Sequence, residues 1–323
     1  MSKQKQKIIV TLLFSYSIYC GLIIGETWDE GFHIQQGKIT LEYLFSFGKI
    51  NNYIYYREYY SPIYWSLQYL LSQILPSTYI IETSHLINLT ISLGTLFGIY
   101  KFSKEFFNRD VGKIVFLILF FYLVIFGHMA INSKDTIIAF SHVWITFFVF
   151  CYLKKQNNTN KTNNYIIYIG ILCAVGTGIQ LFFIGSLVPI IIFIFFDIFY
   201  AKKFICKTFN LKKFFYDLLK CFLIFYFFLI IFWIDAHANI FLNPFIIVTE
   251  ILSSNYTTGY PYNLINGNYY VSTELPNTYI LVNLFFKSPE YFILASGLTI
   301  FLIIFSKKFF LNKFPLFIYK IVL

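Results

Sequence analysis

Long stretches of apolar residues without a charged side chain dominate the pattern along this chain. Uncharged runs cover residues 8–25, 83–100 and 114–133. Each comes close to the roughly 20 apolar residues that a helix needs to cross a bilayer. The pattern therefore predicts an integral membrane protein built from membrane-spanning helices.

About eight spans and an all-α fold follow from this pattern. The candidate spans are Ile8–Gly25, Thr83–Tyr100, Val111–Ala130, Thr136–Leu153, Tyr165–Gly178, Leu181–Tyr200, Phe214–Ile234 and Tyr291–Ser306. The first span follows three lysines, as a signal peptide would, but it lacks a small-residue cleavage site. Because many more spans follow it, we expect a retained helix.

The positions of the basic residues predict the topology. The uncharged run 162–196 is long for one helix and short for two. If it crossed only once, the basic segment 202–213 would lie outside, against the positive-inside rule. Two short helices that break near Gly176-Thr177-Gly178 place that segment inside, and 20 of the 25 Lys and Arg residues are then cytoplasmic. We expect a multi-pass protein with a cytoplasmic N-terminus.

The bias toward Phe, Ile, Asn, Lys and Tyr favours a bacterial cytoplasmic membrane.

Composition excludes several classes of protein. The chain is 58% hydrophobic and only 12% charged, whereas soluble domains are about 45–50% apolar and about 25% charged. The net charge of +10 belongs to the cytoplasmic loops, so no nucleic-acid partner is expected. The five cysteines form no CxxC motif, so neither a metal site nor a disulfide framework is indicated.

Two outer loops, about 26–82 and about 235–290, are longer than connections require, which indicates function. Short helices at the membrane interface are predicted at 64–71 and 275–286. The tyrosine-rich segment 53–60 and the segment Asn255–Tyr270 have the aromatic and amide side chains of carbohydrate-facing surfaces, or of an aromatic belt. The whole chain, 1–323, is expected to form a single transmembrane domain.

Charged residues gather directly after the first span. Glu26, Asp29, Glu30 and His33 would share one helical face if this stretch is helical. Adjacent carboxylates raise one another's pKa, which suits one of them to act as a general base. The alternative is a solvated group of acids that caps a helix.

A second polar cluster, Asn132-Ser133-Lys134-Asp135, lies in the short turn between the third and fourth spans. A lysine at this depth is well placed to meet a lipid phosphate. Structural roles are the alternative: Asp135 would cap the fourth span, and Lys134 would extend toward the interface. Both roles are compatible for Asp135.

The histidines and one arginine are further candidates. All five histidines (His33, His85, His128, His142 and His237) fall in outer loops or in the outer halves of spans. With no HxxH or HExxH spacing, an interhelical hydrogen bond is the favoured role for each. Arg57 would bind phosphate bidentately or pair with Glu58. A divalent metal ion is a candidate cofactor, with Asp29 and Glu30 as its ligands.

These residues, in this order, resemble the phospholipid carrier-dependent glycosyltransferases related to protein O-mannosyltransferases and to the lipid A aminoarabinose transferase. Trp28-Asp29-Glu30 with His33 is similar to the pair that opens the family's first outer loop. The second cluster resembles its Asn-Pro-Lys-Asp turn, with Ser133 in place of proline. Glu274-Leu275-Pro276 with Tyr279, followed by Ser288-Pro289, is similar to the end of the second loop.

The resemblance implies a C-type glycosyltransferase fold and a sugar donor linked through phosphate to a polyprenol. The sugar would move to a lipid, glycan or protein acceptor outside the cytoplasm. Asp29 would take the proton of the acceptor or position its hydroxyl, while Glu30, Asp135 and Lys134 orient the site and the carrier phosphate. Asn132, His33, Arg57 and His237 complete the expected substrate-binding set. Family members usually continue through more spans, so the chain is expected to be short at its C-terminus.

Two other classes compete with this reading. A transporter or flippase of lipid-linked sugars would carry ionisable residues deep inside its spans, whereas Asp197 alone lies well within an apolar run. A membrane scaffold would leave the charged cluster 26–33 without a role. No Walker A loop or GxGxxG motif is present, as expected for an activated sugar that arrives on a lipid.

Overall fold

The computed structural model describes residues 3–50, 61–202, 204–253, 262–272 and 274–305. They divide into two compact units. The first comprises described residues up to 116 and from 127 to 253, and the second comprises 117–126 and those from 262 onward.

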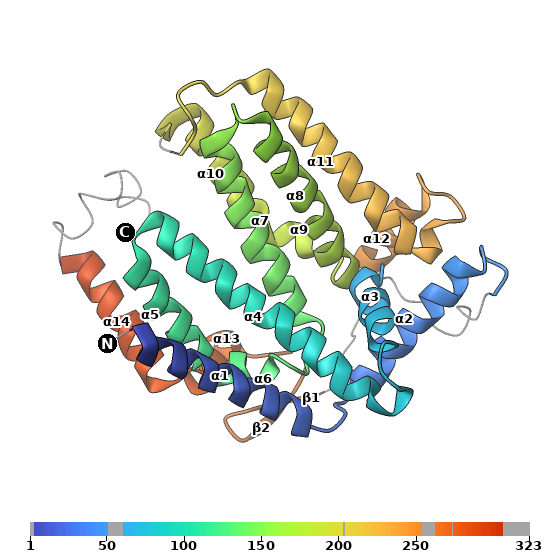
Figure 1. Ribbon diagram of the computed structural model, residues 1–323, viewed down its shortest axis with the longest axis horizontal. Coiled ribbons are helices and arrows are strands. Elements are labelled where there is room, and N and C mark those ends of the chain that lie inside the picture. Colours follow the sequence, from blue (N-terminus) through green and yellow to red (C-terminus); the bar gives the residue numbers. More distant parts are fainter. Residues whose placement is uncertain (1–2, 51–60, 203, 254–261, 273, 306–323) are drawn as a thin grey trace. The chain divides into compact units, whose positions relative to one another are not determined.

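Five long helices of the first unit pack in succession. They are α1 (Lys3–Ile23), α4 (Ile80–Phe106), α7 (Asp135–Lys155), α8 (Thr159–Ile179) and α11 (Leu211–Phe232). Each contacts the next, so that α4 lies beside α7, α7 beside α8, and α8 beside α11 (Figure 1).

Among the described residues, five helical segments are long and apolar enough to cross a membrane: 77–106, 135–155, 160–179, 183–201 and 211–232. Shorter apolar helices cover 8–23, 243–253 and 290–302. These lengths support the predicted helical membrane protein, while the count of eight spans stays a prediction. The predicted break in the run 162–196 is confirmed, because α8 ends at Ile179 and α9 (Phe183–Ser186) follows.

The span predicted at Val111–Ala130 is wrong as one continuous helix. It divides into α5 (Arg109–Phe120) and α6 (Leu123–His128). The amide of Tyr122 bonds the carbonyl of Leu119, three residues back, instead of that of Ile118. The Ile118 carbonyl accepts a hydrogen bond from the hydroxyl of Tyr291 at 3.3 Å. A side chain that captures a helix carbonyl in this way ends the regular ladder of backbone bonds.

Two glycines, one in α2 (Glu30–Phe45) and one in α8, allow the first-loop segment that contains α3 (Ile63–Ser72) to pack closely against both helices. α2 crosses α3 where a Cβ at Gly37 would lie 2.2 Å from the Trp65 carbonyl oxygen. A Cβ at Gly178 would lie equally close to the Ser61 oxygen, and the Ser61 amide donates to the Gly178 carbonyl at 3.0 Å. The predicted helix at 64–71 is confirmed as α3, and its position at an interface stays a prediction.

The remaining elements of the first unit are short. They are η2 (Ser77–Tyr79), α10 (Val188–Phe196), the π-helical η3 (Asp197–Ala201), η4 (Ile234–Ala236) and α12 (Asn243–Ser253). Trp233 and Ile63 belong to a buried apolar cluster where α3, α8, α11 and α12 meet. This cluster fixes α3 beside the long helices.

The second unit contains a feature that the all-α prediction missed. β1 (Tyr262–Ile265) pairs antiparallel with β2 (Asn268–Val271), with Tyr262 opposite Val271. Asn266 and Gly267 connect them with φ of 49° and 81°, the backbone of the two-residue turns that Asn-Gly favours. Part of the segment 255–270 is therefore a hairpin. α13 (Tyr279–Lys287) and α14 (Glu290–Phe305) follow, so the short helix predicted at 275–286 is present.

Candidate functional site

The charged cluster after the first span lies at the start of α2. Asp29 immediately precedes the helix and is exposed, whereas Glu30 is its first residue and is buried. Glu26 also precedes the helix, so the one helical face expected for all four residues is not formed. Glu30 and His33 lie in the first turn of α2, and Asp29 is its N-cap residue.

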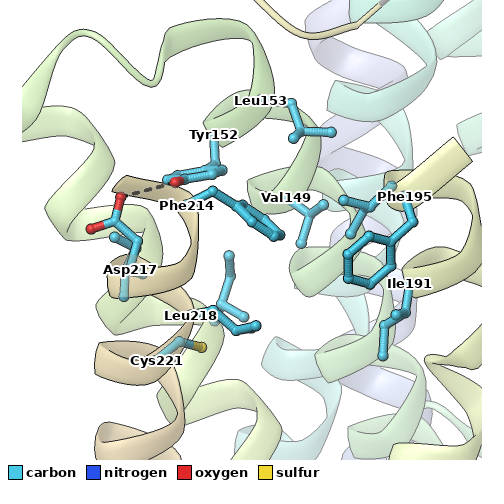
Figure 2. A pocket seen from close by; sticks show the side chains of 12 residues that line it. Val149, Tyr152, Leu153, Ile191, Phe195, Phe214, Asp217, Leu218 and Cys221 are labelled. Atoms are coloured by element: carbon cyan, nitrogen blue, oxygen red, sulfur yellow. Dashed lines mark hydrogen bonds between the residues drawn. The ribbon is translucent and has the colours of Figure 1, made fainter. Parts of the chain in front are cut away.

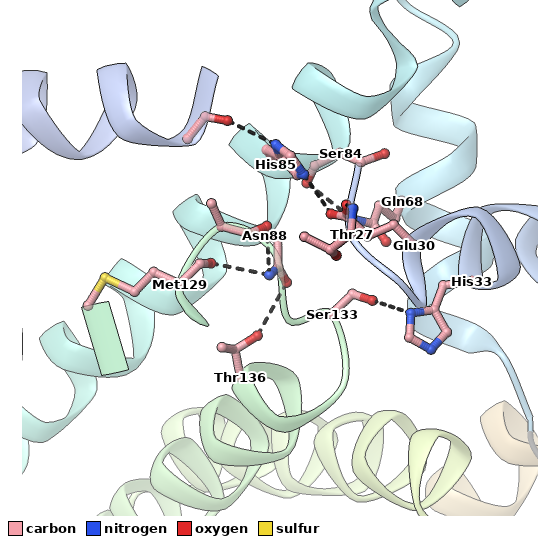
Figure 3. A network of polar contacts seen from close by, with 12 residues as sticks. Thr27, Glu30, His33, Gln68, Ser84, His85, Asn88, Met129, Ser133 and Thr136 are labelled. Atoms are coloured by element: carbon pink, nitrogen blue, oxygen red, sulfur yellow. Dashed lines mark hydrogen bonds and ion pairs between the residues drawn. The ribbon is translucent and has the colours of Figure 1, made fainter. Parts of the chain in front are cut away.

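Glu30 forms a buried pair with His85 of α4. The Nε2 atom of His85 lies 2.6 Å from Glu30 Oε1, and its Nδ1 atom lies 2.9 Å from the carbonyl oxygen of Gly21 in α1. The second carboxylate oxygen, Oε2, accepts the Thr27 backbone amide at 2.6 Å. Both oxygens of Glu30 are therefore occupied, and the Glu30–His85 pair joins α1, α2 and α4 (Figure 3).

The pKa of Glu30 departs from the expected direction. Burial alone would raise it, but the hydrogen bonds from His85 and Thr27 outweigh burial and lower the pKa below its usual value. The expectation that neighbouring carboxylates raise one another's pKa is therefore wrong for Glu30. A carboxylate with a lowered pKa and with both oxygens hydrogen-bonded is suited to holding structure and poorly suited to accepting a proton.

His33 brings the two polar clusters together. Its Nδ1 atom lies 2.8 Å from the hydroxyl oxygen of Ser133, although the two residues are 100 positions apart. The imidazole stacks on the indole of Trp65, with ring centroids 4.2 Å apart and planes at 15°. The indole Nε1 of Trp65 in turn donates to the Ser133 carbonyl at 3.3 Å. Ser133 thus receives contacts from α2, as Figure 3 shows, and from α3.

Two charged residues of the candidate site act on His33. Burial lowers the pKa of His33 to about 4, the negative charge of Asp29 opposes this, and the positive charge of Lys134 reinforces it. His33 is therefore neutral near pH 7. The geometry agrees, because the His33 backbone amide donates to the Asp29 carbonyl at 3.0 Å and Lys134 directly follows Ser133, which contacts the imidazole.

The turn 132–135 is held by the side chain of Asn132. Its carbonyl oxygen accepts the backbone amides of Lys134 at 3.0 Å and Asp135 at 2.7 Å, and its amide nitrogen donates to Asp135 Oδ2 at 3.0 Å. Asn132 is thus committed to shaping the turn. Asp135 is the exposed first residue of α7, where a carboxylate is favoured by the helix dipole. Lys134 is half-buried beside it.

Asn88 supports the turn from α4. Fully buried, it donates to the carbonyls of Met129 at 3.2 Å and Ala130 at 3.0 Å, and it accepts from the Tyr64 hydroxyl at 3.1 Å. Asn88 was not among the residues predicted from the sequence. The signal was present, because His85, Asn88 and Ser92 follow helical spacing inside an apolar span and form one buried polar stripe.

The other predicted residues lie elsewhere. Arg57, with the tyrosine-rich segment 53–60, lies outside the described residues. His237 bonds the Ile230 carbonyl at 2.8 Å and contacts Tyr43 near the end of α2. Tyr43 is ten residues beyond His33, about 15 Å along the helix. His237 is therefore not brought to the start of α2.

The remaining histidines also make hydrogen bonds. His142 reaches the Ser186 carbonyl at 3.2 Å, which links α7 to α9, and exposed His128 lies 3.4 Å from the Asn132 amide nitrogen. The interhelical role favoured for the histidines is seen for His85 and His142, whereas His33 joins α2 to the turn before α7. His128 and His237 bond within their own segments.

A metal site is not formed by the described residues. They contain no group of three or more His, Cys, Asp and Glu side chains placed to hold an ion. Both oxygens of Glu30 are committed to His85 and Thr27. The candidate pair Asp29 and Glu30 therefore does not fit a metal ion in this arrangement.

Comparison of the chain with protein-family models, with curated proteins and with solved structures gives no match.

Proposed function

We propose that this protein is a membrane glycosyltransferase that moves a sugar from a polyprenyl-phosphate donor to an acceptor on the extracytoplasmic side. The observation that carries the proposal is the contact between His33 and Ser133. It joins the two segments that resemble the family's motifs, although 100 residues separate them. Asp29, whose carbonyl accepts the His33 backbone amide, and Lys134, which directly follows Ser133, then lie near one neutral imidazole.

The roles proposed for Asp29 and Lys134 follow from their chemistry. Asp29 is exposed, so an acceptor hydroxyl can reach it. Asp29 takes the proton of that hydroxyl while the acceptor oxygen bonds to the anomeric carbon. The bond from this carbon to the carrier phosphate breaks, and polyprenyl phosphate leaves. Lys134 offers a positive charge to the phosphate in both the donor and the product.

Glu30 serves the site through position and does not act as the base. Because His85 and Thr27 occupy its oxygens, it anchors the turn that carries Asp29. His33 and Trp65 fix the position of the Ser133 turn, and with it Lys134. Preorganisation of this kind is what positioning residues supply to catalysis.

The contacts of the buried acid Asp197 favour a transferase over a transporter. Its carboxylate accepts the backbone amides of Phe204 and Ile205, each at 3.0 Å from Oδ2. This carboxylate caps a loop at the end of a helix. A proton or ion pathway would instead require ionisable groups near the middle of the spans.

The test is an assay of the purified full chain with radiolabelled polyprenyl-phosphate sugars and a panel of hydroxyl acceptors in detergent. Formation of a glycosylated acceptor together with free polyprenyl phosphate supports the proposal. A nucleotide sugar in place of the lipid donor is the matched control and should give no product. With the protein reconstituted into vesicles, movement of intact donor across the membrane without chemical conversion would contradict the proposal and support a flippase.

A further inference from the structure

A second site of interest lies far along the chain from the candidate site, between α7, α8, α10 and α11. A cavity of about 220 Å³ is lined there mainly by aliphatic and phenyl side chains. Figure 2 shows Ile191, Phe195 and Phe214 around it. At one edge the hydroxyl of Tyr152 donates to Asp217 Oδ2 at 2.8 Å, so these two polar groups satisfy each other.

An apolar cavity of this size is not a site for water. Cavities lined by apolar side chains stay dry and accept apolar molecules, and one of about 150 Å³ holds benzene. Left empty, the cavity would cost the packing contacts of every side chain around it. A hydrocarbon occupant is the chemistry that fits.

The cavity reaches the outer surface of the helices. Leu218 of α11 and Ile191 of α10 both line it, yet they are 49% and 43% exposed. Both belong to segments that are long and apolar enough to span a membrane. A lipid chain can therefore enter between α10 and α11 without crossing water.

The charges on this part of the chain select the headgroup. Among the described residues from 149 to 221 the only acids are Asp197 and Asp217, and both are buried. The exposed charges are all positive. They are Lys155, Lys161, Lys202, Lys207 and Lys212. Lys212 lies two residues before Phe214, which lines the cavity. A surface of this kind attracts anionic headgroups, each lysine contributing about fivefold in affinity.

We propose that this cavity binds one acyl chain of an anionic phospholipid, whose headgroup is held by Lys212 and its neighbouring lysines. The site shares no residue with the candidate transferase site. The proposal therefore stands or falls independently of glycosyl transfer.

Native mass spectrometry of the purified full chain, mixed with dioleoyl phosphatidylglycerol or dioleoyl phosphatidylcholine, tests the proposal. We expect one retained phosphatidylglycerol and at least fivefold weaker retention of phosphatidylcholine. Leu218→Trp fills the cavity and should lose the retained lipid. Leu219→Trp is the matched control, because Leu219 is 56% exposed and does not line the cavity. Equal retention by both variants would overturn the site.

The headgroup is tested separately by charge reversal. Lys212→Glu should weaken phosphatidylglycerol by fivefold or more, whereas Lys104→Glu, an exposed lysine of α4, should change it by less than twofold. Equal retention of both lipids by the wild type would overturn the anionic specificity.

A measurement on the wild type avoids any effect of a variant on folding. Phosphatidylglycerol with a photoactivatable diazirine in its acyl chain should mark peptides that contain 149–153 and 214–221. Labelling spread evenly over all apolar helices would overturn the proposal.

Discussion

The imidazole Nδ1 of His33 and the hydroxyl oxygen of Ser133 lie 2.8 Å apart and join the first-loop cluster to the turn before α7. Neither residue could be placed beside the other from the sequence. Their contact is short because the indole of Trp65 stacks on His33 and also donates to the Ser133 carbonyl. The helices α2 and α3 and the turn before α7 thus fix the position of the His33 imidazole.

The burial of His33 predicts a loss of stability in acid. Its pKa is lowered from 6.5 to about 4, mainly by burial. Between these values His33 binds more protons in the unfolded chain than in the folded chain. The contribution of His33 to the free energy of unfolding therefore rises with pH from about 4 to 6.5 and is constant above. The loss at the acid end is about 3 kcal/mol. Unfolding in detergent across this range measures it.

His33→Asn should remove this part of the pH dependence, because asparagine does not titrate. His128→Asn should keep the wild-type loss, because His33 is still present. A wild-type unfolding curve that does not change between pH 6.5 and 4 would show that His33 is not held neutral by burial.

The Glu30–His85 pair predicts a large stability cost for single changes. Removal of one partner leaves the other buried and unsatisfied, which costs about 3–5 kcal/mol. Glu30→Gln, His85→Gln and the double variant form a cycle, with an expected coupling of about 1–3 kcal/mol measured by equilibrium unfolding. Glu42→Gln is the control, because the Glu42 pair with Lys38 is exposed and 3.9 Å long. It should cost less than about 1 kcal/mol. Additive effects in the cycle would mean that the pair is not coupled.

Much of the helical framework could be predicted from the sequence because the apolar runs have about the length that a helix needs to cross a bilayer. The break near Gly178 followed from charge, and α3 followed from an amphipathic aromatic run. The pairing of Glu30 with His85 could not be predicted, since it depends on how α1, α2 and α4 pack. The hairpin was missed although Asn266-Gly267 marks it, because the aromatic and amide side chains around it were assigned to a carbohydrate-facing surface or an aromatic belt.

Lys134 is expected to contribute to the affinity for the lipid donor. Its charge would meet a phosphate that is already ionised in the ground state, so Lys134→Met should raise the KM for the donor while kcat changes little. A hydrogen bond to a charged group is worth about 1.5–3 kcal/mol, which corresponds to roughly tenfold to hundredfold in KM. Lys38→Met, an exposed lysine in α2, is the control. A fall in kcat with an unchanged KM would assign Lys134 to the chemical step instead.

The predicted topology is tested by single cysteines on a background without the five native thiols. A cysteine at Asn160 should resist a membrane-impermeant maleimide in intact cells, because 157–164 is expected to be cytoplasmic. A cysteine at Ala238 is expected to be outside and should label strongly; both positions are exposed. Strong labelling at position 160 would reverse the proposed orientation.

The central claim is that Asp29 is the base of a sugar transfer, and the turnover of Asp29→Asn measures it most directly. The change keeps the size of the side chain and removes its ability to accept a proton. General-base assistance is worth about a hundredfold to ten-thousandfold in rate. At equal membrane abundance, Asp29→Asn should lose that much of the transfer from polyprenyl-phosphate sugar, while Glu26→Gln, an exposed acid just before it, should stay within about threefold of the wild type. Near-normal turnover by Asp29→Asn would contradict the account.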